Sequence, residues 1–289
     1  MEISSEEKQL GKFHDEWAKD VLTCNIIRET LAIHYGLYRK NVKTLKQAIL
    51  SMNDYIGELL NLQNKNKSLI LDAGCGLGGT SIHLAKKYPN SYFSGITISP
   101  SQVVLASNFS NEREVYNTSF SHQNFLKTNF PDNNFDGIFS LESFSYAKDK
   151  DKFIKEMHRI LKPGGRLVVV DVFRTPNSLN PFMQTLYNRY CYEFGNVRHI
   201  SLNKYTNLLK GYNFSEILIE DITKNVRKSI FQWGFISAME YIAINCKSKI
   251  PIINKPKNEK TSEIHGNTFL GGIIGLMGAL GYYGTSFIK

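Results

Sequence analysis

The chain has few cysteines, and they stand far apart. Its 289 residues contain four, Cys24, Cys75, Cys191 and Cys246, with no C-x-x-C pair and no spacing typical of zinc ligands. This pattern excludes a disulfide-stapled scaffold and a zinc ribbon, and no metal is expected. Because no signal-peptide pattern opens the chain, we expect a protein of the reducing cytoplasm.

The chain also lacks a basic arm, an RNA-binding motif and any internal repeat. Its formal net charge of +9 arises from lysines and arginines spread along the whole length. The run over residues 247–260 is interrupted by prolines, asparagines and an acid, which is typical of a solvated loop. Nucleic acid is therefore not an expected partner.

A long uncharged run lies at the C-terminal end, over residues 268–288. It is long enough to span a bilayer, and Gly271 and Gly275 form a G-x-x-x-G pair. Its many glycines and the strand-like ending Tyr282 to Ile288 favour a buried helix that turns into the last strand of a sheet. Peripheral contact with a membrane stays open.

Short apolar runs alternate with helical stretches from Ser68 onward. We expect strands near residues 68–73, 91–97, 118–122, 135–141, 166–172 and 215–222. We expect helices near residues 42–59, 151–161, 204–209 and 230–244. This alternation predicts an α/β fold with a parallel sheet that is covered on both faces, and 42% hydrophobic residues supply enough core.

A glycine-rich turn follows the first expected strand, over Leu71-Asp72-Ala73-Gly74-Cys75-Gly76-Leu77-Gly78-Gly79-Thr80. Its glycines let the backbone approach a ligand, and a helix that begins near Gly79 directs unpaired N–H groups at the same place. The turn also matches the G-x-G-x-x-G pattern of dinucleotide sites. However, Asp72 would repel a pyrophosphate and attract an ammonium group, and the second strand ends at Thr97 without a ribose-binding acid. These residues favour S-adenosylmethionine, with NAD as the alternative.

Four blocks make the chain resemble the class I S-adenosylmethionine-dependent methyltransferases, namely residues 71–78, 95–102, 130–136 and 161–167. The second block and Leu141-Glu142-Ser143 are similar to the branch that holds tocopherol, sterol and natural-product methyltransferases, with cyclopropane fatty acid synthases as more distant relatives. The resemblance implies a Rossmann-like sheet of seven mostly parallel strands with the last strand antiparallel. Flanking helices, a helical N-terminal segment and helical lid insertions are also implied.

The resemblance further implies the cofactor, S-adenosylmethionine, with S-adenosylhomocysteine as product, and the residues around it. These are Asp72, Gly74, Gly76, Gly78, Thr97, Ile98, Gln102, Asn124, Phe125 and Leu141. Asn124 stands where many relatives carry an aspartate beside the adenine amino group, and its amide carbonyl can accept the same N–H hydrogen bond.

Four kinds of functional division, over six ranges, follow from these motifs. We expect a helical cap over residues 1–66, the cofactor-binding core over 67–175, substrate-lid insertions over 176–213 and 226–267, and the remaining core elements over 214–225 and 268–289.

Four side chains are candidates for handling the methyl acceptor. Glu142 follows the fourth strand, at the edge where open parallel sheets bind ligands. Tyr146 could orient an acceptor oxygen. Ser145-Tyr146 stand where cyclopropane synthases and tocopherol or sterol enzymes carry Glu-His, so their carbon-methylation chemistry is not carried over. Tyr35 is the preferred lid residue, and His199 is a candidate general base because an unperturbed histidine pKa lies near working pH. Glu142 could contact either the acceptor or the cofactor. For Tyr35, Tyr146 and His199, a structural role in packing is the alternative.

We predict an enzyme that transfers a methyl group to an oxygen or carbon of a lipophilic or aromatic small molecule, such as an isoprenoid or phenolic natural product. An apolar acceptor suits the aromatic residues between Phe182 and Phe194, with Trp233 and Phe235. An acidic head would suit Arg189, Arg198 and Arg227. The alternatives are methylation of a small-molecule amine, with cation–π contacts to the acceptor, and a nucleic-acid-binding or inactive cofactor-binding module. The oligomeric state is not predicted.

Overall fold

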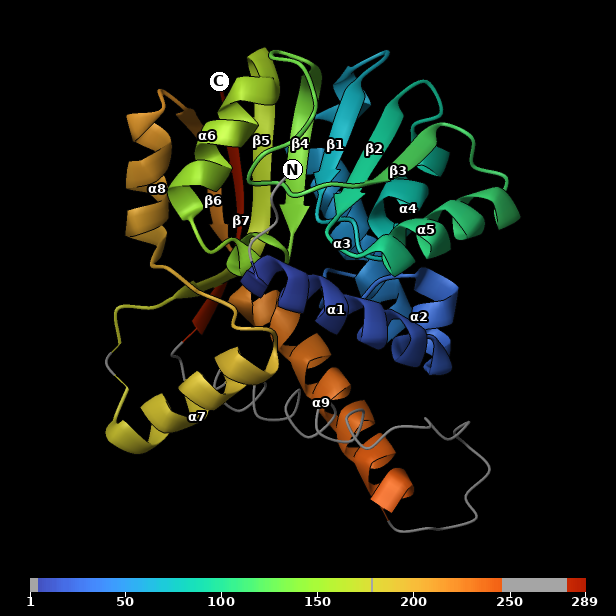
Figure 1. The fold of residues 1–289 in the computed structure, drawn as a ribbon, viewed down its shortest axis with the longest axis vertical. Helices are drawn as coiled ribbons and strands as arrows, with labels where there is room; N and C mark the ends of the chain where they lie inside the picture. The colour runs from blue at the N-terminus through green and yellow to red at the C-terminus, as the bar shows by residue number, and fades with distance from the viewer. Residues whose placement is uncertain (1–4, 178, 246–279) are drawn as a thin grey trace.

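The computed structural model describes residues 5–177, 179–245 and 280–289, which form one seven-stranded sheet with helices on both faces (Figure 1). The strand order is β3-β2-β1-β4-β5-β7-β6. The strands that pair in parallel are β1 (Leu69–Ala73), β2 (Tyr92–Thr97), β3 (Thr118–His122), β4 (Phe135–Leu141) and β5 (Leu161–Arg174). β7 (Leu280–Ile288) runs antiparallel between β5 and β6 (Ser215–Asp221). This arrangement confirms the predicted fold class.

The described helices are α1 (Ser5–Asp20), α2 (Asn25–Thr30), α3 (Leu45–Leu59), α4 (Gly79–Lys87), α5 (Pro100–Glu112), α6 (Lys150–Ile160), α7 (Pro181–Glu193), α8 (Leu202–Gly211) and α9 (Thr223–Asn245). Short 3-10 turns lie at Val21–Thr23, Leu62–Asn64 and Phe144–Tyr146. Five helices begin after a residue whose side-chain oxygen accepts the N–H of the third helical residue; these caps are Thr44, Ser99, Asp149, Asn180 and Ser201. Such caps satisfy donors that the helix itself cannot pair, so they fix where each helix starts.

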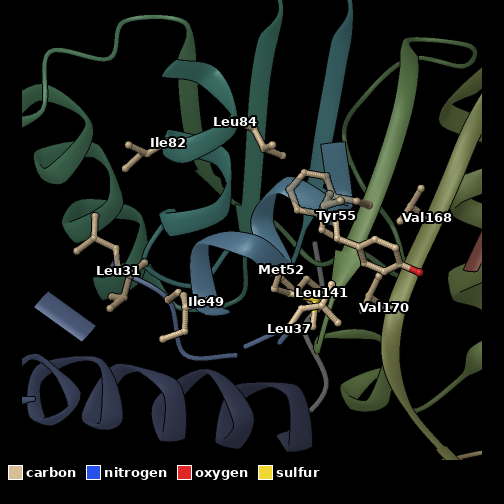
Figure 2. Packing of buried hydrophobic residues seen from close by; sticks show 14 of the residues in the cluster. Leu31, Leu37, Ile49, Met52, Tyr55, Ile82, Leu84, Leu141, Val168 and Val170 are labelled. Atoms are coloured by element: carbon tan, nitrogen blue, oxygen red, sulfur yellow. The ribbon is translucent and has the colours of Figure 1, made fainter. Parts of the chain in front are cut away.

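Alternating side chains of the central strands fill two separate cores. On one face of β5, Val168 and Val170 belong to a buried cluster with Ile49 and Met52 of α3. Figure 2 shows Met52 of α3 next to Leu141 of β4, and Tyr55 beside the two valines. On the other face, Leu167 and Val169 pack with α6 and α8. Because both faces are covered, the strands are apolar at successive positions rather than at every second one.

Three element boundaries differ from the sequence prediction. The α3 helix begins at Leu45 rather than near residue 42, because Thr44 caps it together with Gln47. The β5 strand begins at Leu161 rather than near residue 166, because Leu161 already pairs with Phe135 before a register shift. The α9 helix begins at Thr223, seven residues earlier than expected.

The α8 helix corrects one part of the expected lid. Residues 202–211 fall in a range that we expected to cover substrate, but Tyr205 and Leu209 are fully buried in the core cluster beneath β5. This helix therefore forms part of the layer that covers the sheet.

The C-terminal tail is described only from Leu280, where it forms β7 and confirms the predicted last strand. The expected loop over residues 247–260 and the glycine-rich run up to residue 279 lie outside the described residues. Among the helices of the described segments, none combines the length and apolar character that a membrane crossing requires.

The packing of β7 on α3 gives a test of the fold. A Cβ on Gly284 would lie 2.2 Å from the Tyr55 hydroxyl oxygen. Tyr55 donates that hydroxyl to Glu220 Oε2 at 2.7 Å, so its ring cannot withdraw without losing the bond. We expect Gly284→Ala to lower the free energy of unfolding by about 2 kcal/mol in urea titrations. Gly211→Ala, with no atom within 4 Å of its Cβ, is the control and should change stability by less than about 1 kcal/mol. Equal losses in both variants would contradict this account.

Candidate active site

A cavity lies at the carboxyl ends of the parallel strands, where the strand order reverses. β1 pairs with β2 on one side and with β4 on the other. The connections that follow β1 and β4 therefore lead away from each other, which leaves a crevice at the carboxyl end of β1. The cavity has a volume of about 270 Å³. Its walls come from the turns after β1, β2, β3 and β4, and from α1, residues 31–35, α7 and α9.

The turn after β1 forms one wall of the cavity. Gly74 has a φ of +110°, and a Cβ there would lie 2.3 Å from Ser143 Cβ, so this position requires glycine. Gly76 has a φ of +52°, and the nearest atom to a Cβ there would be Ile33 Cδ1 at 3.9 Å. Within the described residues, the N–H groups of Gly76 and Leu77 donate to no protein acceptor. The turn therefore offers open space and unpaired donors to a ligand.

Gly78 does not line this cavity, although we expected it to contact the cofactor. It has a φ of +79° just before α4, and a Cβ there would lie 2.8 Å from Phe120 Cζ. Its role is to shape the turn and to admit the Phe120 ring.

Asp72 is a buried carboxylate at the base of the cavity, with 3% of its surface exposed. Ser81 donates to its Oδ2 at 2.7 Å. Burial raises the pKa of Asp72 to about 7, and the Ser81 hydrogen bond opposes that rise only in part. A cation bound here would favour the charged carboxylate.

Thr97 and Gln102 bond to each other at the end of β2. Thr97 Oγ1 donates to Gln102 Oε1 at 2.6 Å, and both residues line the cavity together with Ile98. Asp15 of α1 reaches the same place, because its Oδ1 accepts from Ser99 Oγ at 2.5 Å and from the Ser101 N–H at 3.0 Å. This carboxylate holds α1 across the start of α5 (Figure 1).

Asn124 lies after β3 and is also held by α1. Its Nδ2 donates to Glu7 Oε1 at 2.7 Å, and its Oδ1 accepts the Leu126 N–H at 2.9 Å. The amide oxygen that we expected to face an adenine amino group therefore already accepts a backbone donor, with one lone pair left. Phe125, the next residue, lines the cavity as expected and packs edge to face on Phe153.

Glu142 follows β4 in the left-handed backbone region, with a φ of +50°. Its Oε1 accepts the Tyr35 N–H at 2.8 Å and the Tyr282 hydroxyl at 2.5 Å. Among the described residues, no donor reaches its Oε2, which keeps access to the cavity that Glu142 lines. Burial raises the pKa of Glu142 to about 8, with Asp171 adding to the rise.

Aromatic side chains form the opposite part of the cavity. Tyr35 packs edge to face on Tyr282, and Tyr146 packs edge to face on His14 of α1. Further lining residues are Leu141, Tyr190, Phe194, Trp233 and Ile236. Burial raises the pKa values of Tyr35, Tyr146 and Tyr190, so these hydroxyls stay protonated.

His199 lines the cavity, but its pKa does not lie near working pH as we expected. Burial, with Lys150 and Arg174 nearby, lowers its pKa to about 3. Its Nδ1 contacts the Tyr187 hydroxyl at 3.1 Å, and its ring stacks on Tyr190. A conjugate acid this strong makes His199 a weak base at neutral pH.

The expected cationic subsite is wrong as assigned. Arg189, Arg198 and Arg227 are exposed, and none of them lines the cavity. The charged lining is mainly acidic instead, with Asp72, Glu142 and Asp171, and Lys148 is the lysine that lines it.

Sequence reasoning missed three groups that complete the site. Glu7, Leu10 and His14 of α1 close the cavity, Tyr282 fixes Glu142 from β7, and Asp171 lies at its floor. The position of Asp171 late in an expected strand was a usable signal. No local pattern marks the other two, because the contacts join residues far apart in the chain.

A family model described as "Methyltransferase domain" matches residues 70–165. The tocopherol O-methyltransferase of Arabidopsis thaliana is 32% identical over 170 residues, which are 57% of this chain and 49% of that protein. The ajmaline N-methyltransferase of Rauvolfia serpentina is 28% identical over 241 residues, 78% of this chain and 80% of that protein. The chain spans about half the length of the tocopherol relatives it matches.

Solved structures share the fold over nearly the whole chain. The [4+2]-cyclase SpnF superposes with a TM-score of 0.78 at 21% identity, covering 100% of this chain and 98% of that one. The mycolic acid cyclopropane synthase CmaA1 superposes with a TM-score of 0.79 at 17% identity, covering 97% and 98%. The sequence matches, the fold and the glycine turn make the chain similar to the class I S-adenosylmethionine-dependent methyltransferases, with the methyltransferase domain model matched over residues 70–165. Its relatives lie in the branch that acts on small molecules.

The raised pKa of Asp72 predicts how cofactor binding depends on pH. A bound cation stabilises the charged carboxylate, so binding below pH 7 must release its proton, and affinity rises with pH until Asp72 is ionised in the free protein. We expect the Kd for S-adenosylmethionine to fall about five- to tenfold between pH 6 and pH 8 in calorimetry. Asp72→Asn should bind more weakly and lose this dependence, whereas Asp54→Asn, outside the cavity, should keep it. If Asp72→Asn kept the same pH dependence of Kd, the proton released on binding would come from a group other than Asp72.

The open space at Gly76 gives a second test. We expect Gly76→Val to lower S-adenosylmethionine affinity at least about tenfold, because its side chain would project into space that only Ile33 borders. The positive φ adds strain of about 1–2 kcal/mol, so the variant should still fold, as checked by circular dichroism and thermal unfolding. Unchanged cofactor affinity in the folded variant would show that the ligand lies elsewhere in the cavity.

Proposed function

We propose that this protein transfers a methyl group from S-adenosylmethionine to a nitrogen or oxygen nucleophile of a lipophilic small molecule. Carbon methylation is the second candidate, since one relative is named 2-methyl-6-phytyl-1,4-hydroquinone methyltransferase. The observation that carries the proposal is Glu142, whose Oε1 is fixed by two donors while its Oε2 keeps access to the cavity.

The cofactor would lie along the ends of β1, β2 and β3. The open cradle at Gly76, its two unpaired N–H groups and the buried carboxylate of Asp72 fit a ligand with a carboxylate and a cationic centre. Thr97 and Gln102 would flank the ribose, and Asn124 and Phe125 the adenine. When bound, S-adenosylmethionine supplies a methyl group on a positively charged sulfur.

Glu142 would orient the acceptor and take its proton. The nucleophile gains the new bond to carbon, the bond from sulfur to carbon breaks, and the proton leaves the nucleophile for Glu142 Oε2. A pKa of about 8 makes Glu142 a stronger base than an ordinary carboxylate, although a smaller fraction is ionised at neutral pH. His199, with its pKa of about 3, is a poorer candidate for this role.

The aromatic wall supports an acceptor with an apolar body. Tyr35, Tyr146, Tyr190, Phe194 and Trp233 exclude water and offer ring faces. The acidic lining and these rings suit a neutral phenol or an amine better than an acceptor with an anionic head. Relatives named for a tocopherol and for ajmaline are consistent with both classes.

Glu142→Gln tests this role while preserving the architecture. The glutamine carbonyl can still accept from Tyr35 N–H and Tyr282 Oη, but its amide cannot take a proton. We expect kcat to fall about 10²- to 10⁴-fold for a prenylated phenol or a hydrophobic secondary amine, with S-adenosylmethionine affinity unchanged. In the unmodified protein, kcat should rise with pH through about 8.

Two controls separate catalysis from positioning. Glu58→Gln removes an exposed carboxylate that pairs with Arg39 and should leave kcat unchanged. Tyr282→Phe removes a hydrogen bond that lowers the pKa of Glu142, so the rising limb of the kcat profile should move to higher pH. Full activity of Glu142→Gln, measured as transfer of a labelled methyl group, would contradict the proposed role of Glu142.

A further inference from the structure

The α7 helix exposes two aromatic side chains on its outward face. Its inward side chains Met183, Tyr187 and Tyr190 are buried, and Tyr190 lines the cavity. Its outward side chains Phe182 and Tyr192 are 69% and 70% exposed. Only one side of this helix therefore packs against the rest of the protein.

The α9 helix is divided in the same way. Val226 and Trp233 are buried, and Trp233 lines the cavity. Phe231 and Phe235 are 55% and 67% exposed. They continue a stripe at helical spacing that begins with exposed cations, Lys224, Arg227 and Lys228.

The charge at the start of α9, before its exposed rings, has a single sign. Residues 223–239 contain no aspartate or glutamate, but they contain Lys224, Arg227 and Lys228, and these three cations are exposed. The acids of the two helices, Glu193 and Glu240, stand at the last residue of α7 and after this stretch of α9. Exposed aromatic rings beside a group of cations are the combination that binds the headgroup region of an anionic bilayer.

Both helices extend beyond the carboxyl ends of the parallel strands, at the same end of the molecule (Figure 1). The start of α9 is held rigidly, because Gly36 N–H donates to Ser229 Oγ at 2.7 Å and Tyr38 N–H donates to the Asn225 carbonyl at 3.0 Å. The same helices that present the exposed rings also supply Tyr190 and Trp233 to the cavity. A membrane bound at this end would lie next to the acceptor part of the site.

We propose that the exposed face formed by Phe182 and Tyr192 of α7 and by Lys224, Arg227, Lys228, Phe231 and Phe235 of α9 docks on an anionic lipid bilayer. The α7–α9 face would insert its rings among the headgroups while its cations contact lipid phosphates. The protein would then collect apolar acceptors from the bilayer. Docking itself goes beyond the proposed function, because it requires neither cofactor nor methyl transfer.

A second basic surface shows why charge alone does not select the α7–α9 face. A groove beside α6 contains Lys127, Lys152 and Lys155, but Arg159 within it is paired with Asp132 and Glu156. In the described part of the chain, that groove presents no largely exposed aromatic side chain. It therefore provides a charge-matched control.

The test is co-sedimentation of the full chain with vesicles, without S-adenosylmethionine. We expect binding to vesicles of 70% phosphatidylcholine and 30% phosphatidylglycerol, and at least about tenfold weaker binding to pure phosphatidylcholine. Phe231→Gln/Phe235→Gln should reduce binding to the anionic vesicles at least about tenfold, since the apolar area that inserts is lost. Lys224→Gln/Arg227→Gln should reduce it by a similar factor and weaken its dependence on salt.

The control variants change exposed aromatic and basic residues elsewhere on the surface. Tyr116→Gln, at a side chain 75% exposed, and Lys127→Gln/Lys155→Gln should bind vesicles like the unmodified protein. No vesicle binding by the unmodified chain, or equal losses in the control variants, would overturn the proposal. A dimer in sedimentation velocity that Phe231→Gln/Phe235→Gln dissociates would assign the face to self-association and would also overturn it. Cofactor affinity measured on the same variants keeps this result separate from failure of the proposed methyl transfer.

Discussion

The Glu142 carboxylate is the interaction on which the arrangement of the site depends. It joins three segments that are distant in the chain, because one oxygen accepts from Tyr35 of the N-terminal segment and from Tyr282 of β7. The left-handed backbone at Glu142 turns the side chain toward both donors. Such a conformation costs about 1–3 kcal/mol in a residue other than glycine and persists where the surroundings enforce it. Directly beside it, Ser143 fits against Gly74, so the turns after β1 and β4 define each other's positions.

The cavity combines two kinds of wall with different origins. The part proposed for the cofactor is built from the ends of neighbouring parallel strands and from backbone N–H groups, which are fixed by the sheet. The part proposed for the acceptor is built from helices and segments outside the sheet, held by side-chain contacts such as Asp15 with Ser99 and Glu7 with Asn124. The first part is therefore set by the fold, and the second can differ among proteins that share it. The cyclase among the structural neighbours illustrates that one fold supports more than one chemistry.

Burial controls the protonation of the ionisable groups in the cavity. Desolvation raises the pKa values of Asp72 and Glu142 and lowers that of His199, so all three favour their neutral forms more than they would in water. This makes the site responsive to a bound cation and makes Glu142 a stronger base than an ordinary carboxylate, as its proposed role requires. The two-faced helices α7 and α9 connect this enclosed region with the outer surface, since each buries aromatic residues on one side and exposes them on the other.

The sequence alone determined the sheet, its strand positions and the place of the ligand-binding turn. These features rest on local patterns: apolar runs of strand length, glycines that a turn requires, and caps such as Ser99 and Asp149. The tertiary structure decided which side chains meet. It placed α1 over Asn124, paired Tyr282 with Glu142, moved α8 into the core and left the three arginines outside the cavity. It also decided the protonation of His199, because a pKa depends on burial and neighbouring charges. Those properties come from packing between residues far apart in the chain, which local sequence patterns do not encode.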